Sequence, residues 1–239
     1  MDTSQIDLLF YTDQVSGTRA CLTTEEMHHA IHVLRRKVGD EIHFTDGKGM
    51  LYLGRITEIT KKEAWLDVVT AEQQKRQPYQ ISIAVSPTKS FDRMEWCVEK
   101  LTEMGVQRII PMLCTRAERK KWNQERIRKI AISAMKQSKR AYLPDLAEPM
   151  QLRELIQDVP SGMIKYIAVL DYKSVPASVH YKSGSDVLIL IGPEGDFTNE
   201  EITMATQADF VPLTLGDFRL RTETAAMMAA ATIQTLNQK

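Results

Sequence analysis

Two segments in the last quarter of the chain repeat the same order of features: an apolar run, a turn with glycine, and the start of a helix. The first run is Val187–Ile191, which leads into Gly192-Pro193-Glu194-Gly195, and the second is Phe210–Leu215, which leads into Gly216. Apolar runs of this length between turn residues predict strands that are buried on both faces. Strands that alternate with helices in this way constrain the chain to an α/β fold with a mostly parallel sheet.

Helix starts follow both turns. Thr198 and Glu201 have the spacing of a capping box, and Thr222 is the expected N-cap of an Ala- and Met-rich helix. Ligands of open α/β sheets bind beyond the carboxyl ends of the strands, where glycine lets the backbone come close to them. We therefore expect a ligand pocket at these two turns, with tight turning alone as the other explanation of Gly192 and Gly195.

The first 72 residues have a different pattern, because their short runs alternate in polarity and helical periodicity is confined to the region around Thr24–Arg36. Asp46-Gly47-Lys48-Gly49 separates two such runs and predicts a hairpin turn, so this part predicts a small β-barrel. The polar segment 71–78 ends in proline and predicts a linker between domains at residues 1–72 and 78–239. Further strands of the second domain are predicted at Ile81–Val85, Arg108–Leu113 and Tyr166–Leu170.

Charge is balanced over the whole chain, with 31 basic and 31 acidic residues, which argues against a protein that coats nucleic acid nonspecifically. The stretch from Arg116 to Arg140 is different, since it holds ten lysines and arginines against two acids, Glu118 and Glu125. Such a stretch is either a solvated helix face or a surface that docks a phosphate backbone.

Several classes of protein are disfavoured. The first residues lack the basic and apolar regions of a signal peptide, and no apolar run is long enough for a membrane helix. Three cysteines without metal-like spacing indicate a reducing compartment, so we expect a cytoplasmic protein with no membrane and no metal. His28 and His32 are four residues apart, but no partner acid follows at the spacing of a zinc site.

The two late segments read IGPEGDFTNEE and LGDFRLRTETAA. They resemble the signature segments of RsmE-type 16S ribosomal RNA uridine N3-methyltransferases, although that family commonly has glycine where Asp196 stands. The resemblance implies a PUA-like RNA-binding β-barrel followed by a SPOUT-type, trefoil-knotted α/β methyltransferase domain. It also implies S-adenosylmethionine as cofactor, 16S ribosomal RNA or the small ribosomal subunit as partner, and a homodimer. The apolar helix that begins near Thr222 favours the homodimer as well, because a helix apolar nearly all round must be buried on more than one side.

Methylation of uridine N3 requires loss of a proton, and the charge that spreads over O2 and O4 is stabilised by a nearby cation. Arg221 and Arg219 are candidates for that cation, and Glu223 or Glu194 for a base or a cofactor anchor. Arg221 and Glu223 could instead pair with each other, or Glu223 could interact with the helix dipole. The resemblance implies that the cofactor contacts Leu190, Gly192, Pro193, Glu194, Gly195, Leu215, Gly216 and Leu220.

Candidate RNA contacts come from two parts of the chain. Arg35 and Arg128 are basic residues that meet either RNA phosphates or solvent. The resemblance adds Gln137, Ser138 and Arg140, in a segment where Lys136 stands in place of the usual acid. Two other functions stay open at this point: an RNA-binding assembly factor without turnover, and a related SPOUT enzyme that acts on a ribose hydroxyl or another base.

Overall fold

The computed structural model describes residues 6–117, 122–170 and 173–238. Contacts divide the chain into two compact units, of which unit 1 comprises Met1–Arg76 with Ile132–Leu143, and unit 2 comprises Gln77–Ala131 with Pro144–Lys239. The helix α3 (Gln124–Gln137) therefore contributes its first part to unit 2 and its last part to unit 1. No pattern in the sequence indicated that residues 132–143 belong with the N-terminal unit.

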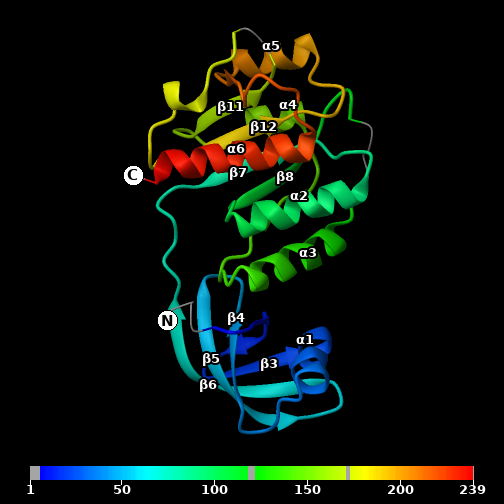
Figure 1. Cartoon of the computed structure of the whole chain (residues 1–239), viewed down its shortest axis with the longest axis vertical. Helices are drawn as coiled ribbons and strands as arrows, with labels where there is room; N and C mark the ends of the chain where they lie inside the picture. The colour runs from blue at the N-terminus through cyan, green and yellow to red at the C-terminus, as the bar shows by residue number, and fades with distance from the viewer. Residues whose placement is uncertain (1–5, 118–121, 171–172, 239) are drawn as a thin grey trace. The chain divides into compact units, whose positions relative to one another are not determined.

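Unit 1 is built on a mixed sheet with the strand order β1-β4-β5-β6-β3-β2 (Figure 1). β1 runs parallel to β4, and the other neighbours are antiparallel, including the β4–β5 hairpin that was predicted around Asp46–Gly49. Register shifts at Leu53/Gly54 and Ile56/Glu58 mark irregularities of the kind that bend a strand. The strands are β1 (Leu9–Tyr11), β2 (Val15–Ser16), β3 (Arg19–Thr23), β4 (Glu41–Thr45), β5 (Met50–Ile59) and β6 (Glu63–Gln73).

The predicted helical region of unit 1 forms α1 (Thr24–His28) and continues as one π-helical segment, η2 (His29–Val33). Met27 and Ala30 face inward from these turns and pack against Phe10, Leu22 and Phe44 of the sheet. This apolar core is small, which is expected of a unit with one sheet and one short helix.

Unit 2 contains a sheet in which every pairing between the named strands is parallel, which confirms the predicted parallel sheet. Its strand order is β10-β8-β7-β12-β11-β13, with β9 beside β8. Its strands are β7 (Ile81–Val85), β8 (Arg108–Leu113), β9 (Asp145–Leu146), β10 (Met150–Gln151), β11 (Ile164–Ala168), β12 (Val187–Ile191) and β13 (Val211–Leu213). Its helices, besides α3, are α2 (Phe91–Glu103), α4 (Leu152–Gln157), η3 (Ala177–Val179), α5 (Asn199–Gln207) and α6 (Thr222–Asn237).

Helices cover both faces of this sheet. α2 and α6 pack against each other, with α6 against β7 and β12 (Figure 1). The other face carries Ala84, Ile110, Ile167 and Leu190, which form one core with α4 and α5. β7 and β12 are buried at every position, because successive side chains of a central strand enter both cores.

Two predictions about the late segments need correction. The run Phe210–Leu215 forms a strand only at Val211–Leu213, which pairs with β11 and forms an isolated bridge with Val175. Thr222 is the first residue of α6, and the N-cap is Arg221. The Thr222 hydroxyl donates to the carbonyl oxygen of Gly192 at 3.0 Å, so it ties α6 to the turn after β12. The capping box of Thr198 and Glu201 is confirmed at the start of α5.

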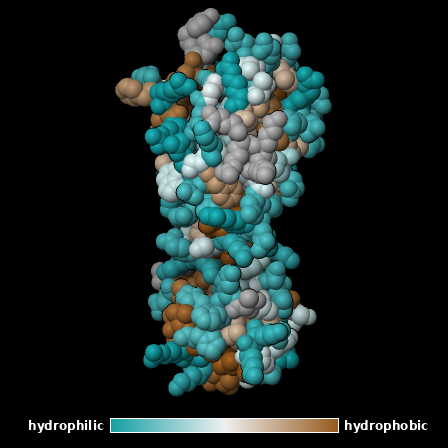
Figure 2. Space-filling model, turned by 90° about the vertical axis from the view of Figure 1, so that its right-hand side faces the viewer, coloured by the Kyte–Doolittle hydropathy of each residue, from teal (hydrophilic) through white to brown (hydrophobic). Residues whose placement is uncertain are grey.

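The surface of each unit is mainly hydrophilic on the face shown in Figure 2, with hydrophobic residues scattered between the polar ones. Among the described helices, none is both long and apolar enough to span a bilayer.

Candidate active site

A cavity of about 360 Å³ lies in unit 2 where β11, β12 and β13 end. This is the position at which open α/β sheets bind their ligands. Its walls come from the residues after β11, from the turn after β12 and from the segment between β13 and α6. The lining residues are Arg93, Ala168, Val169, Leu170, Ile191, Gly192, Pro193, Glu194, Asp196, Leu213, Leu215, Gly216, Phe218, Arg219, Leu220, Arg221, Thr222 and Ala225.

Most of the residues predicted to contact the cofactor lie in these walls. Leu190 and Gly195 do not. Leu190 is fully buried in the core beneath α4 and α5, and the carbonyl oxygen of Gly195 accepts a hydrogen bond from Arg116 at 2.8 Å. The two turns are therefore brought together as expected, but not every residue within them faces the cavity.

The two glycines that line the cavity are required for different structural reasons. A Cβ on Gly192 would lie 2.9 Å from Cε2 of Phe197, whose ring is buried in the core. Gly216 has φ +117°, which side chains rarely adopt, and a Cβ there would meet no atom within 4 Å. The side chain of Thr214 fixes the Gly216 turn, since its hydroxyl oxygen lies 3.2 Å from both the N–H and the carbonyl oxygen of Gly216. Packing requires the first glycine, and backbone conformation requires the second.

A chain of charges borders the cavity. The guanidinium of Arg93 pairs with Glu194 at 2.7 Å and lies 3.8 Å from Glu223. Arg219 donates to the carbonyl oxygen of Glu194 at 2.9 Å. Glu223 is buried and does not line the cavity, and its Oε2 has no hydrogen-bond partner among the described residues. Burial, followed by the nearby Glu223 carboxylate, raises the pKa of the Cys97 thiol to about 12, so Cys97 carries no thiolate at neutral pH.

Like Arg219, Arg221 is exposed at the cavity wall. Its carbonyl oxygen accepts the first hydrogen bond of α6 from Ala225 at 2.8 Å, while its guanidinium has no partner among the described residues. The pairing of Arg221 with Glu223, left open by the sequence, is not formed, because Glu223 faces Arg93. Of the three arginines in the cavity wall, Arg93 pairs with a carboxylate and Arg219 donates to a backbone carbonyl, whereas the guanidinium of Arg221 contacts neither kind of group among the described residues.

Several residues of the site were not identified as such from sequence, among them Arg93, Asp196 and Phe218. Arg93 lies in the first turn of α2, about a hundred residues before the late segments, and reaches the site because β7 pairs with β12. Asp196 has φ +64°, an uncommon conformation for a residue other than glycine, and Phe218 is 83% exposed at the cavity wall. Two signals in the sequence could have indicated these residues: Asp196 is a charged residue where the family commonly has glycine, and Phe218 is an aromatic residue in a polar turn.

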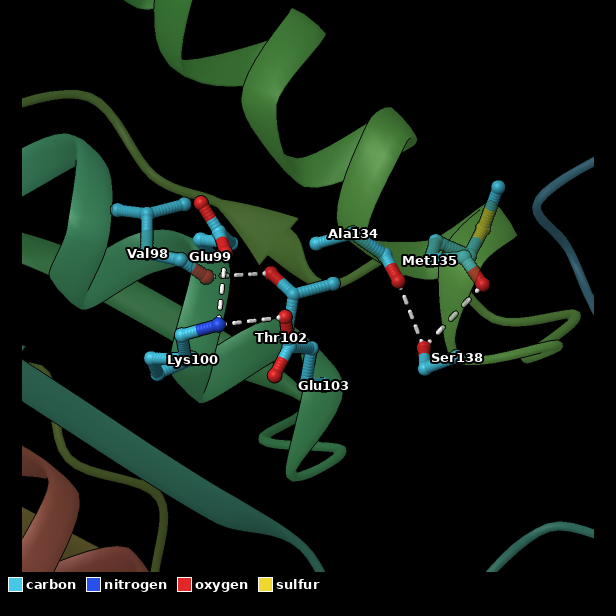
Figure 3. Close-up of polar contacts among 8 residues, drawn as sticks. All are labelled: Val98, Glu99, Lys100, Thr102, Glu103, Ala134, Met135 and Ser138. Carbon is cyan, nitrogen blue, oxygen red and sulfur yellow. Dashed lines mark hydrogen bonds and ion pairs between the residues drawn. The ribbon is translucent and has the colours of Figure 1, made fainter.

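The predicted RNA-contact residues lie outside this cavity. Arg35 and Arg128 are exposed, and Arg35 has φ +57°. Gln137 is exposed, whereas Ser138 and Arg140 are half-buried after the end of α3. Figure 3 shows the Ser138 hydroxyl turned back to its own helix, where it donates to the carbonyl oxygens of Ala134 and Met135 at 2.7 and 3.2 Å.

Two cations of the basic stretch 116–140 are paired with acids. Arg126 pairs with Glu95 and lies over the ring of Phe91, and Lys136 pairs with Glu26. Arg119, Lys120 and Lys121 of this stretch lie outside the described residues. The rings of His28 and His32 lie with their centroids 5.1 Å apart and their planes tilted by 43°, and no cluster of three or more metal-binding side chains occurs in residues 6–117, 122–170 and 173–238.

Comparison with known proteins extends over both units. Residues 75–234 match the family described as RNA methyltransferase domain, and residues 22–69 match the one described as RNA methyltransferase PUA domain. The Ribosomal RNA small subunit methyltransferase E of Bacillus subtilis is 30% identical over 228 residues, which cover 89% of this chain and 88% of that protein.

Solved structures agree with these matches. A probable rRNA-methyltransferase from Porphyromonas gingivalis has a TM-score of 0.91 and 39% identity, covering 96% of this chain and 98% of that one. The Ribosomal RNA small subunit methyltransferase E from Neisseria gonorrhoeae, bound to S-adenosyl methionine, has a TM-score of 0.86 and 30% identity, covering 96% of this chain and 97% of that one. Every residue that lines the cavity lies inside the longer matched region.

Proposed function

Because the chain belongs to the RNA methyltransferase family, with a PUA-like domain followed by a SPOUT-type methyltransferase domain, we propose that it methylates N3 of a uridine in 16S ribosomal RNA of the small ribosomal subunit. S-adenosylmethionine is the proposed methyl donor. The observation that carries the proposal is the cavity at the strand ends, whose wall presents the unpaired guanidinium of Arg221.

The cavity has the properties that S-adenosylmethionine requires. Its volume of about 360 Å³ falls within the range of small-molecule sites, roughly 300–1,000 Å³. Ile191, Leu213 and Leu215 give it an apolar wall for a base ring, and the turn after Gly192 offers backbone polar groups. At Gly216 the space that a side chain would fill is open, and the acids Glu194 and Asp196 suit a cationic ligand. When bound, the cofactor supplies an electrophilic methyl group.

The residues of the chain then have to favour the reactive form of the uracil. Loss of the N3 proton leaves a negative charge on O2 and O4, and a fixed cation close to these atoms stabilises it. Arg221 suits this role because its guanidinium stays charged at every working pH and has two parallel donors. Arg93 is less suited, since two carboxylates already face it.

Glu223 fits a supporting role better than that of a base. It is buried, lies outside the cavity wall and faces Arg93, which in turn holds Glu194. We therefore assign Glu223 to the positioning of Arg93, and the turn that carries Glu194 is fixed by this chain of charges. A general base has to lie within hydrogen-bond distance of the proton that it removes, and Glu223 does not line the cavity.

Substitution of Arg221 by lysine tests the role of the guanidinium. The change keeps the charge and removes the planar fork, so we expect kcat to fall ten- to a thousandfold, about the range seen when oxyanion donors are lost. Cofactor affinity should change little. The defect should shrink as pH rises, because uridine then ionises without assistance. Arg153→Lys on α4, outside the cavity, is the matched control. A defect that lies wholly in cofactor affinity, or that does not vary with pH, assigns Arg221 to binding instead.

Mass spectrometry of nucleosides from methylated RNA separates this proposal from the alternatives. A 3-methyluridine product supports it, whereas a 2′-O-methyl nucleoside or another methylated base indicates a different SPOUT reaction. A binding factor without turnover would give no product and would have no need of S-adenosylmethionine, whose binding is measured by calorimetry.

Two further features belong to the proposal. We propose a homodimer, because Met228 on α6 is 42% exposed and small alanines near it let a second helix approach closely. The cytoplasm is the proposed compartment, since ribosomal RNA is the proposed substrate.

A further inference from the structure

A second cavity, of about 400 Å³, lies within unit 1 and is lined by Lys48, Gln73, Gln74, Lys75, Arg76 and Tyr142. It is formed by the turn between β4 and β5, the end of β6, and the segment that follows α3. Half of its lining residues are cationic and none is acidic. The sequence analysis did not identify this site, because Tyr142 is more than sixty residues away from the other five.

Hydrogen bonds fix the walls of the second cavity. The side chain of Gln74 donates to the carbonyl oxygen of Lys139 at 3.2 Å and accepts from the N–H of Ala141 at 2.9 Å. The N–H of Gly49 donates to the carbonyl oxygen of Ala141 at 2.8 Å, and the hydroxyl of Tyr142 donates to that of Gln74 at 3.2 Å. The segment after α3 is thereby held against both the hairpin turn and the end of β6.

The ring of Tyr142 lies directly on the backbone of Gly49. A Cβ at Gly49 would lie 2.3 Å from Cζ of this ring, so only glycine permits the contact. On the ring, the guanidinium carbon of Arg76 is 5.5 Å from the centroid, within the range of a cation–π contact. Tyr142 thus sets the position of Arg76 without neutralising its charge.

The cations of this cavity keep their charge for a ligand. Asp46 is the nearest acid in the turn, and its Oδ1 already accepts the N–H groups of Lys48 and Met50 at 2.8 and 3.2 Å. No carboxylate pairs with the side chains of Lys48, Lys75 or Arg76 among the described residues. Three unpaired cations on a fixed wall attract a group with concentrated negative charge.

We propose that this cavity binds a phosphate group of the RNA substrate, with Lys48, Lys75 and Arg76 as the cations that hold it. A phosphodiester fits because arginine and lysine both bind phosphate oxygens, arginine through two parallel donors. The ligand's identity as RNA rests on the proposed function, whereas the anion site itself rests on the geometry of unit 1. The contact would position RNA without reading its sequence.

The test is the salt dependence of binding to 16S ribosomal RNA. The triple variant Lys48→Gln, Lys75→Gln and Arg76→Gln removes three exposed charges, none of which has an ion-pair partner among the described residues. Loss of one phosphate contact lowers the slope of log K against log salt by about 0.7–0.9, so we expect the slope to fall by about that amount and affinity in low salt to fall at least tenfold. The matched control is Lys61→Gln with Lys62→Gln, two exposed lysines in the turn between β5 and β6.

Three outcomes decide the proposal. A reduced slope in the triple variant, with cofactor affinity unchanged and a smaller effect in the control, supports it. An unchanged slope, or an equal loss in the control, overturns it. Inorganic phosphate tests whether the ligand is instead a free anion. If phosphate binds saturably below millimolar concentration in calorimetry, and the triple variant loses this binding but keeps its RNA affinity, the cavity is assigned to a free anion. Methyl transfer by the unaltered protein is measured in parallel, so a failure of the proposed function is recognised separately.

Discussion

Substitution of Gly216 by alanine isolates the contribution of one backbone conformation to cofactor binding. The residue has φ +117°, and the added methyl group would meet no atom within 4 Å, so the substitution creates no clash in the protein. A side chain in such a sparsely populated conformation costs about 1–3 kcal/mol. In the absence of ligand the turn can relax to another conformation, because it lies in an exposed segment between β13 and α6.

The ligand then has to restore the original conformation, so the strain appears as lost affinity. At 1.4 kcal/mol per tenfold, about 1–3 kcal/mol corresponds to a roughly five- to 150-fold rise in the Kd for S-adenosylmethionine. The Tm of the free protein should change by only a few degrees. Both quantities are accessible to titration calorimetry and to thermal unfolding of the same samples.

Gly162→Ala provides a matched control for strain. Gly162 also has a positive φ, +85°, with nothing within 4 Å of the added methyl group, and it lies outside the cavity. It should carry a similar conformational cost without any change in cofactor affinity. If Gly216→Ala binds S-adenosylmethionine as tightly as the unaltered protein, or if both variants lose affinity equally, the assignment of the Gly216 turn to the cofactor is refuted.

Two other predictions address packing and assembly. Gly192→Ala should lower the free energy of unfolding by about 1–3 kcal/mol, since its Cβ would lie 2.9 Å from the buried ring of Phe197, and Tm should fall by about 2–4 °C per kcal/mol. Recovery of Tm in the double variant Gly192→Ala/Phe197→Leu would attribute the loss to this contact, and an unchanged Tm in the single variant would contradict it. Light scattering at micromolar concentration should give twice the 27.2 kDa mass of one chain, and a monomer would count against the homodimer.

Three of the central strands could be predicted to the residue, because their burial leaves a continuous apolar run in the sequence. Ile81–Val85, Arg108–Leu113 and Val187–Ile191 have the predicted bounds. The strand predicted at Tyr166–Leu170 is β11, which lies at Ile164–Ala168. The edge strand β13 was predicted too long. β11 is the one strand it pairs with among the described residues, besides a bridge to Val175, and Pro212 at its centre has no N–H to donate, so apolar content alone does not define its ends.

The division of α3 between the two units could not be predicted, because its cause is tertiary. Residues 132–143 join unit 1 through contacts such as that of Tyr142 with Gly49, between segments more than ninety residues apart. Local periodicity identifies a helix but does not identify the unit that its apolar face contacts. The trefoil knot, implied by resemblance, stays a prediction.

The candidate site could be predicted where its residues are close together in the sequence, at the two late turns. The pair Arg93 and Glu223 could not be predicted, because these residues are far apart in the sequence. Their pairing depends on α2 lying beside α6, and that neighbourhood follows from the strand order β7-β12 rather than from any motif. The sequence therefore indicated the cavity wall but not the charges that position it.

The numbers of positive and negative side chains around the cavity indicate which step of the reaction Arg221 would support. Arg93, Arg219 and Arg221 carry three positive charges, and Glu194, Asp196 and Glu223 carry three negative ones, so the site is neutral before any ligand binds. S-adenosylmethionine has one net positive charge, and a uridine without its N3 proton has one negative charge, so the reacting pair leaves the balance unchanged. The carboxylate of Glu194 pairs with Arg93, whereas Arg219 donates to the backbone carbonyl of Glu194. We propose that Arg221, whose guanidinium has no partner among the described residues, is the cation that faces the uridine anion. Without the charge of Arg221 the site would be net negative, which would still attract the cationic cofactor but would oppose ionisation of the uridine. The loss would then fall on turnover rather than on cofactor binding.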